Sequence, residues 1–156
     1  GERPLFLPQK PYLPLGTLRD VLVYPFGASV DDQQLQQILR RVDMSSLADK
    51  LDDSRLWSHV LSLGEQQRLA FARVLVQKPQ WIFLDEASSA LDEPAENRLY
   101  QLLVEALPES AIISVGHRSS LLQHHQHCLR LQGNGAWVLE VVQQQGPADG
   151  LHPAPA

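Results

Sequence analysis

Apolar side chains recur every three or four residues in several parts of the chain, which is the spacing of one face of an α-helix. Three of these stretches begin at residue types that cap helices, namely Thr17, Asp31 and Ser62. A fourth begins at Pro94, which suits the first helical turn because its missing N–H would have no partner there. Pro79 should end the helix that follows Ser62. The pattern therefore predicts these four helices, and a short fifth helix from Ser119 to about His125.

Two short apolar runs, residues 81–84 and 111–115, each follow a predicted helix. Runs of this kind are typical of strands that are covered on both faces. Farther along, residues 128–131 and 137–142 flank a turn at 133–135 and predict a terminal β-hairpin. The chain should thus contain two buried strands and one hairpin.

Helices that alternate with buried strands indicate an α/β layered domain with a mainly parallel sheet. A length of 156 residues suits one such domain with a substantial core. We expect it to span residues 1–142, including the hairpin. Residues 143–156 are rich in Gln, Gly, Pro and Ala and predict a disordered tail.

Composition and charge narrow the possible functions. The formal net charge is −5, which argues against binding a nucleic-acid backbone, because such binding needs clustered Lys and Arg. Cys128 is the single cysteine and cannot form an internal disulfide, which suits a reducing compartment. No apolar run approaches the roughly 18 residues that cross a bilayer. Any membrane role would therefore belong to a segment or chain outside this sequence.

Two adjacent carboxylates, Asp85 and Glu86, follow the apolar run 81–84. They leave the carboxyl end of the predicted strand, which is where ligands bind in open α/β sheets. One carboxylate can hold Mg²⁺, directly or through water, and the other can orient and deprotonate a water molecule. The alternative is a solvated turn with two acidic residues.

A second candidate site lies at the start of the helix after Ser62. Free backbone N–H groups and the helix dipole attract anions at such a position. Gly64 has no side chain, so a phosphate can approach the backbone closely. The alternative is an ordinary capped amphipathic helix.

Together, residues 61–65 (Leu-Ser-Leu-Gly-Glu) and 82–86 (Ile-Phe-Leu-Asp-Glu) resemble the signature and Walker B motifs of the ATP-binding-cassette (ABC) ATPase family. Three further elements match in the family's order: a glutamine loop at 7–11, a Ser-Ala-Leu-Asp loop at 89–92, and a histidine, His117, after the next strand. The resemblance implies a P-loop NTPase-like fold, with ATP and Mg²⁺ as ligands.

The resemblance also implies a role for each residue near the chain's own nucleotide. Asp85 would organise the Mg²⁺ shell. Gln9 would help to ligate Mg²⁺ and would sense the γ-phosphate. Glu86 would be the general base toward the attacking water, and His117 would contact the γ-phosphate.

Other matched residues would act across an interface. In the family, the signature motif closes over the ATP of a second, opposed domain, which implies this role for Ser62, Gly64 and Glu65. Asp92 would help to couple the two nucleotide sites. The implied partner is a second ABC ATPase domain, as a head-to-tail homodimer.

Residues 6–20, 61–73 and 114–118 are similar to the SbmA/BacA-like permease–ATPase fusions, bacterial relatives of the peroxisomal fatty-acyl transporters. A transmembrane region precedes the ATPase domain in those proteins. The similarity implies ATP-driven transport at the cytoplasmic face of the bacterial inner membrane, with the transmembrane domain in the same full-length chain. Tyr12 and Leu13 would then contact either a helix of that domain or their own loop.

None of the three lysines, Lys10, Lys50 and Lys78, follows a glycine, so the chain contains no P-loop of the form Gly-x-x-x-x-Gly-Lys-Ser/Thr. We expect a truncated ATPase domain with negligible ATP hydrolysis of its own. Its sheet should lack a strand and expose backbone edges. Two alternatives remain: a soluble ABC-type ATPase that acts on nucleic acid or ribosomes, and a non-catalytic remnant used for interaction.

Overall fold

The computed structural model describes residues 3–143, so the tail predicted at 143–156 lies outside the described residues except for Gln143. The chain divides after His117 into two compact units. The predicted limit of one domain at residue 142 stays a prediction.

The strands are β1 (Leu5–Leu7), β2 (Gly16–Thr17), β3 (Ser54–Arg55), β4 (Trp81–Asp85), β5 (Ala111–Val115), β6 (His127–Gly133) and β7 (Ala136–Val141). The helices are α1 (Leu18–Val23), α2 (Asp32–Arg41), α3 (Trp57–Val60), α4 (Leu63–Gln77) and α5 (Glu93–Ala106), with 3₁₀ turns η1 (Ser45–Leu47) and η2 (Ser119–His124).

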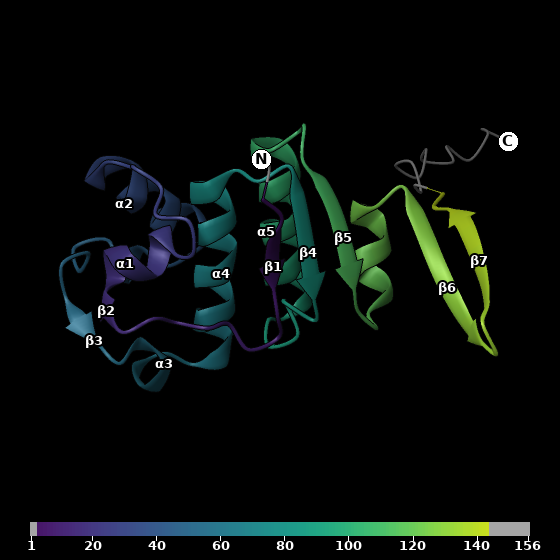
Figure 1. Ribbon diagram of the computed structural model, residues 1–156, viewed down its shortest axis with the longest axis horizontal. Coiled ribbons are helices and arrows are strands. Elements are labelled where there is room, and N and C mark those ends of the chain that lie inside the picture. Colours follow the sequence, from purple (N-terminus) through teal and green to yellow (C-terminus); the bar gives the residue numbers. More distant parts are fainter. Residues whose placement is uncertain (1–2, 144–156) are drawn as a thin grey trace, which may run out of the picture. The chain divides into compact units, whose positions relative to one another are not determined.

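The first unit contains a three-stranded parallel sheet in the order β1-β4-β5 (Figure 1). In its register Leu7 pairs with Leu84, and Asp85 pairs with Val115. Parallel pairing brings the carboxyl ends of all three strands to one edge of the sheet. The predicted α/β class with a parallel sheet is therefore confirmed.

Helix caps formed where the sequence placed them. Thr17 and Ser62 each form a full capping box, with Asp20 and Glu65 respectively. The Asp31 carboxylate accepts the backbone N–H of Gln34 at 2.8 Å. Helix α4 ends before Pro79, as the sequence predicts, after Lys78 takes the left-handed conformation that often closes a helix.

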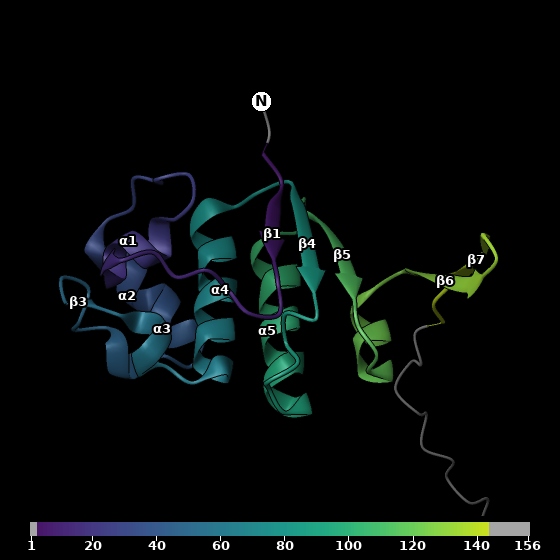
Figure 2. The same cartoon turned by 60° about the horizontal axis from the view of Figure 1, so that its bottom comes forward.

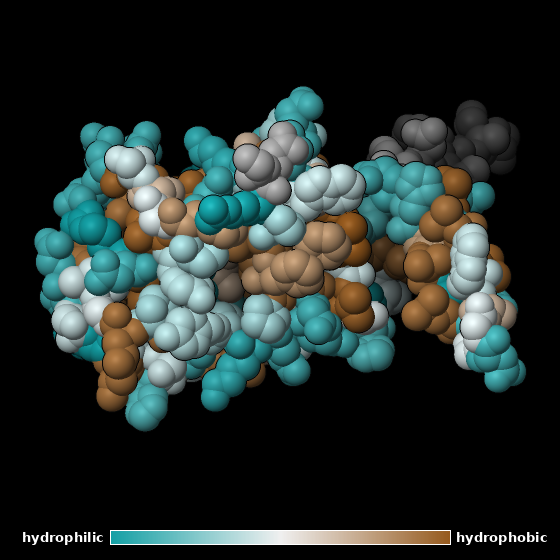
Figure 3. Space-filling view, in the orientation of Figure 1, coloured by the Kyte–Doolittle hydropathy of each residue, from teal (hydrophilic) through white to brown (hydrophobic). Residues whose placement is uncertain are grey.

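The predicted coverage of the sheet on both faces is wrong for the described residues. Ile82 and Leu84 point into the core, but Trp81 is 47% exposed and Val115 is 59% exposed. The physical reason is that α4 and α5 lie on one face of the sheet (Figure 2), so the side chains that alternate to the other face remain open. Phe6 and Phe83 stack on this open face, with ring centroids 4.6 Å apart, and Figure 3 shows apolar atoms over β1, β4 and β5.

Helix α5 is fixed to the sheet by a buried tyrosine. The Tyr100 hydroxyl and the Ser114 hydroxyl of β5 are hydrogen-bonded at 2.9 Å. The rings of Phe71, on α4, and Tyr100 pack in a T-shaped arrangement with centroids 5.8 Å apart. Burial raises the pKa of the Tyr100 hydroxyl to about 12, so the neutral form is held in the core at physiological pH.

The helices before α4 form a layer beside the sheet and are joined to α4 by side-chain hydrogen bonds. Arg73 Nε donates to the carbonyl of Val21 at 2.7 Å, and Gln77 Nε2 donates to the carbonyl of Val23 at 2.6 Å. Both carbonyls belong to α1, and the last carbonyl groups of a helix receive no hydrogen bond from an N–H of the same helix. α4 therefore serves as the shared support of the helical layer and the sheet.

The second unit contains the predicted hairpin, in which β6 and β7 pair antiparallel. Gly133, Asn134 and Gly135 all have positive φ, as a tight hairpin turn requires. Within residues 3–143, β5 has a strand partner on one side only, since β6 and β7 form a sheet of their own. This arrangement agrees with the expected exposed strand edge.

In the part of the chain that the structure describes, none of the helices combines the length and apolar character of a bilayer span.

Candidate functional site

The strand-end carboxylates lie where the sequence placed them. Asp85 is the last residue of β4 and is exposed, and Glu86 follows it in the left-handed region at φ +52°. The backbone N–H of Glu86 donates to the carbonyl of Val115 at 2.9 Å, which fixes the turn to β5. A left-handed non-glycine residue costs on the order of 1–3 kcal/mol, and such strain gathers at functional sites. The backbone thus redirects the Glu86 side chain as the strand ends.

His117 reaches the same place from the neighbouring strand. It follows the end of β5 by two residues, and its Nε2 lies 3.0 Å from Glu86 Oε1. The Glu86 side chain is 28% exposed, whereas that of His117 is 93% exposed. The structure therefore brings together a partly shielded carboxylate and an accessible imidazole, although their roles stay predictions.

Gln9 belongs to this edge of the sheet by register. Leu7 pairs with Leu84, and Gln9 and Glu86 each follow their strand partner by two residues. The Gln9 side chain is exposed, and its backbone carbonyl accepts a hydrogen bond from Gln67 Nε2 at 2.8 Å. Gln9, Asp85, Glu86 and His117 all lie at or just after the carboxyl ends of β1, β4 and β5, and we call these four residues the strand-end cluster.

The remaining candidates line a polar pocket of about 320 Å³ at the start of α4. The Ser62 hydroxyl accepts the backbone N–H of Glu65 at 3.2 Å, and Glu65 Oε1 accepts that of Ser62 at 3.0 Å. An acceptor role leaves the hydroxyl proton of Ser62 available to an anion. Asp92 caps α5 by accepting the N–H of Ala95 at 2.8 Å. We call Ser62, Gly64, Glu65 and Asp92 the helix-tip cluster.

The structure supplies a second reason for glycine at position 64. A Cβ atom there would lie 3.2 Å from the carbonyl oxygen of Ala90, closer than ordinary van der Waals contact. The loop after β4 therefore packs directly on the first turn of α4. Packing within the chain therefore favours glycine at position 64, in addition to the predicted close approach of a phosphate.

Three side chains of these two regions, those of Arg68, Asp43 and Gln67, were not predicted from the sequence to have a role. Arg68 and Asp43 line the pocket and form an ion pair at 3.5 Å. Helical spacing could have indicated Arg68, because it lies four residues after Gly64 on the same face. Gln67 joins loops that are distant in sequence, and no local signal could have indicated it.

The donor set of the strand-end cluster fits Mg²⁺. Asp85 and Gln9 offer the oxygen ligands that this hard cation takes, and both side chains are exposed. Across residues 3–143 there is no group of three or more His, Cys, Asp or Glu side chains placed to hold a metal alone. Mg²⁺ in nucleotide sites is commonly bound by one or two carboxylates together with phosphate oxygens, and a carboxylate with an amide oxygen is compatible with that mode of binding.

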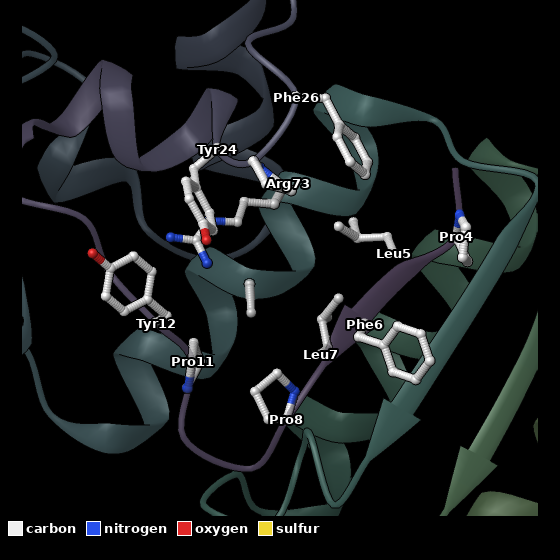
Figure 4. A pocket seen from close by; sticks show the side chains of 12 residues that line it. Pro4, Leu5, Phe6, Leu7, Pro8, Pro11, Tyr12, Tyr24, Phe26 and Arg73 are labelled. Atoms are coloured by element: carbon white, nitrogen blue, oxygen red, sulfur yellow. The ribbon is translucent and has the colours of Figure 1, made fainter. Parts of the chain in front are cut away.

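A second recess, of about 350 Å³, is apolar and lies beside the segment that follows β1 (Figure 4). Tyr12 is 62% exposed there, and its ring lies 5.3 Å from that of Tyr24. The Arg73 guanidinium lies 5.3 Å from the Tyr24 ring, and Arg73 is 6% exposed. Leu13 is 8% exposed and packs in the core, so of the two residues only Tyr12 offers a surface to a partner.

Comparison with known proteins adds independent evidence. A family model described as "ABC transporter" matches residues 5–89, just over half of the chain. An uncharacterized ABC transporter ATP-binding protein of Haemophilus influenzae is 50% identical over 134 residues, covering 85% of this chain and 23% of that protein.

Two named relatives agree with this match. The lysosomal cobalamin transporter ABCD4 of Mus musculus is 43% identical over 146 residues, covering 86% of this chain and 24% of that protein. The inner membrane ABC transporter ATP-binding protein YddA of Escherichia coli is 38% identical over 113 residues, covering 72% of this chain and 20% of that protein. The chain thus spans about a quarter or less of the length of these relatives. With both site clusters and these similarities in place, the chain belongs to the ABC transporter family.

Proposed function

We propose that this chain is the C-terminal portion of the ATP-binding domain of a transporter that couples ATP hydrolysis to transport across a membrane. The observation that carries the proposal is the 3.0 Å contact between Glu86 and His117 beside Asp85, at the carboxyl edge of a parallel sheet. This is the edge at which open α/β sheets bind ligands. The transported substrate would be recognised outside this chain.

Each residue of the strand-end cluster has a role in this proposal. When bound, ATP would supply the phosphoryl group and Mg²⁺ would neutralise charge on the phosphate oxygens. Asp85 and Gln9 would hold the cation through their side-chain oxygens. Glu86 would accept the proton of the attacking water, and His117, whose Nε2 lies 3.0 Å from the Glu86 carboxylate, would contact the γ-phosphate.

The helix-tip cluster would serve a second copy of the domain. Ser62 and Gly64 lie at the positive end of a fifteen-residue helix, where an anion is favoured. Glu65 and Asp92 both line the same pocket. We propose that a neighbouring copy presents its nucleotide to this pocket in a head-to-tail homodimer.

The transmembrane partner would meet the apolar recess beside Gln9 (Figure 4). Tyr12 is exposed there and follows Gln9 by three residues. A partner bound in the recess would therefore displace a segment that is continuous with Gln9 of the strand-end cluster. We place the chain at the cytoplasmic face of the membrane, the bacterial inner membrane if the similarity to the permease–ATPase fusions holds. The transporter relatives and the net charge of −5 both disfavour a nucleic-acid partner.

We expect these 156 residues alone to hydrolyse ATP no faster than the background. No Gly-x-x-x-x-Gly-Lys-Ser/Thr loop occurs among them, so the lysine and backbone amides that grip the β- and γ-phosphates are missing. Phosphate release by this chain would be compared with that of the full-length protein, by which we mean this chain joined to an upstream segment that carries a P-loop. Turnover by the 156 residues above about 1 s⁻¹, within the ordinary enzyme range, would contradict the expectation. A full-length protein that never binds ATP would instead support the non-catalytic remnant.

Asp85→Asn should raise the Mg²⁺ concentration that gives half-maximal ATPase activity in the full-length protein. We expect a rise of roughly 10–100-fold, the loss typical when a group that supports a bound metal is removed. Activity would be measured over a Mg²⁺ titration at saturating ATP. Asp31→Asn is the control, because Asn also caps a helix and Asp31 lies at the start of α2. An unchanged Mg²⁺ midpoint in Asp85→Asn would remove Asp85 from the metal site.

A further inference from the structure

Gln67 is a fully buried polar residue, 0% exposed, in the second turn of α4. Burying an amide is costly unless its donors and acceptor are all hydrogen-bonded. The partners of Gln67 therefore indicate what holds this side chain in the core.

The Gln67 amide bonds two loops that are far apart in sequence. Its Nε2 donates to the carbonyl of Gln9 at 2.8 Å and to the hydroxyl of Ser89 at 3.2 Å. Its Oε1 accepts the backbone N–H of Ala90 at 2.9 Å. Only a primary amide offers two donors and an acceptor in this arrangement, so neither Glu nor an apolar residue can replace it.

These bonds connect the two candidate clusters. The loop at Gln9 belongs to the strand-end cluster, whereas Ser89 and Ala90 lead to Asp92 of the helix-tip cluster. The carbonyl of Ala90 also packs against Gly64, so this loop contacts α4 at two neighbouring points. One side chain thus sits between groups that, on the proposed function, serve two different nucleotides.

We propose that Gln67 is a positioning residue that holds the Gln9 loop and the 89–92 loop in register with the tip of α4. The proposal rests on the proposed function for the roles of the two clusters. A rigid group that contacts both clusters is a physical route by which the state of one nucleotide site affects the other. Loss of the Gln67 amide should release both loops while the rest of the fold remains.

The neighbouring residue supplies a matched control. Gln66 is 4% exposed and lies on the same helix, but its Nε2 donates only to nearby carbonyls, those of Ser58 at 3.1 Å and Leu61 at 3.0 Å. Replacing either glutamine by methionine keeps an unbranched side chain of similar length and removes the amide. The two variants therefore differ in which segments lose a hydrogen bond.

The first test measures amide hydrogen exchange without ligand. Gln67→Met should speed exchange about five- to ten-fold, the factor expected for one lost hydrogen bond, in peptides that cover residues 88–92, because the N–H of Ala90 loses its acceptor. Gln66→Met should leave these peptides as in the wild type. If Gln67→Met speeds exchange equally in every peptide, or does so no more than Gln66→Met in residues 88–92, the positioning role is refuted.

The second test measures function in the full-length protein. Gln67→Met should raise the Mg²⁺ midpoint of ATP hydrolysis about five- to ten-fold through displacement of Gln9, a change that a loss of folded protein cannot produce. If Gln67→Met does not fold, Gln67→Leu is used, since its apolar side chain has a similar volume and also removes the amide. An unchanged midpoint in the folded variant refutes the proposal. A wild type without Mg²⁺-dependent ATPase activity would instead refute the proposed function, while the exchange result would still decide the positioning role.

Discussion

Glu86→Gln should lower the kcat of ATP hydrolysis by the full-length protein about 10²–10⁴-fold, the range that a general base contributes. Glutamine has the same shape but cannot accept a proton from water. The KM for ATP should change little, because in the proposed function the carboxylate acts on the water and the nucleotide is held elsewhere. Phosphate release under saturating ATP measures the effect.

Glu109→Gln is the matched control for this substitution. Glu109 is exposed and lies between α5 and β5, at the amino edge of the sheet and so opposite the strand-end cluster. Its replacement should leave kcat within about twofold, as most surface substitutions are nearly neutral. If Glu86→Gln kept more than a tenth of the wild-type kcat, another group would have to be the base.

Leu103→Ala should lower the free energy of unfolding of this chain by about 2–5 kcal/mol, the usual cost of removing a buried leucine side chain. Leu103 is 0% exposed on α5, the helix that supports the sheet through Tyr100. A loss of this size is a large part of the roughly 5–15 kcal/mol that stabilises an ordinary domain. Urea unfolding, followed by circular dichroism, gives the midpoint and slope.

Val104→Ala provides the comparison, since Val104 is the next residue along α5 and is 44% exposed. Its unfolding free energy should stay within about 0.5 kcal/mol of the wild type. Equal unfolding midpoints for the two variants would mean that α5 does not bury Leu103 in solution.

Local patterns predicted the helices and the positions of the candidate residues well. Thr17 and Ser62 cap helices through contacts three residues away, and such short-range chemistry can be read from neighbouring letters. The adjacent pair Asp85 and Glu86 was placed by the apolar run before it. The family match covers residues 5–89 and confirms the resemblance that those motifs carried.

What the sequence could not predict depends on contacts between distant segments. An apolar run does not reveal how many faces of its strand are covered, so Trp81 and Ile113 are exposed where burial was expected. Gln67 reaches Gln9 across 58 positions, and a glutamine on a helix looks the same whether it faces solvent or two loops. Such residues become visible only when the strands and helices are assembled.

If Glu86 is the general base that we propose, its backbone conformation makes stability and catalysis compete at one position. Its φ of +52° suits glycine or asparagine better than a residue with a longer side chain. A selection for thermal resistance alone would therefore favour variants that relax this turn and discard the carboxylate. Residue 86 should therefore be sequenced in any thermostable variant of this protein before its ATPase activity is assayed.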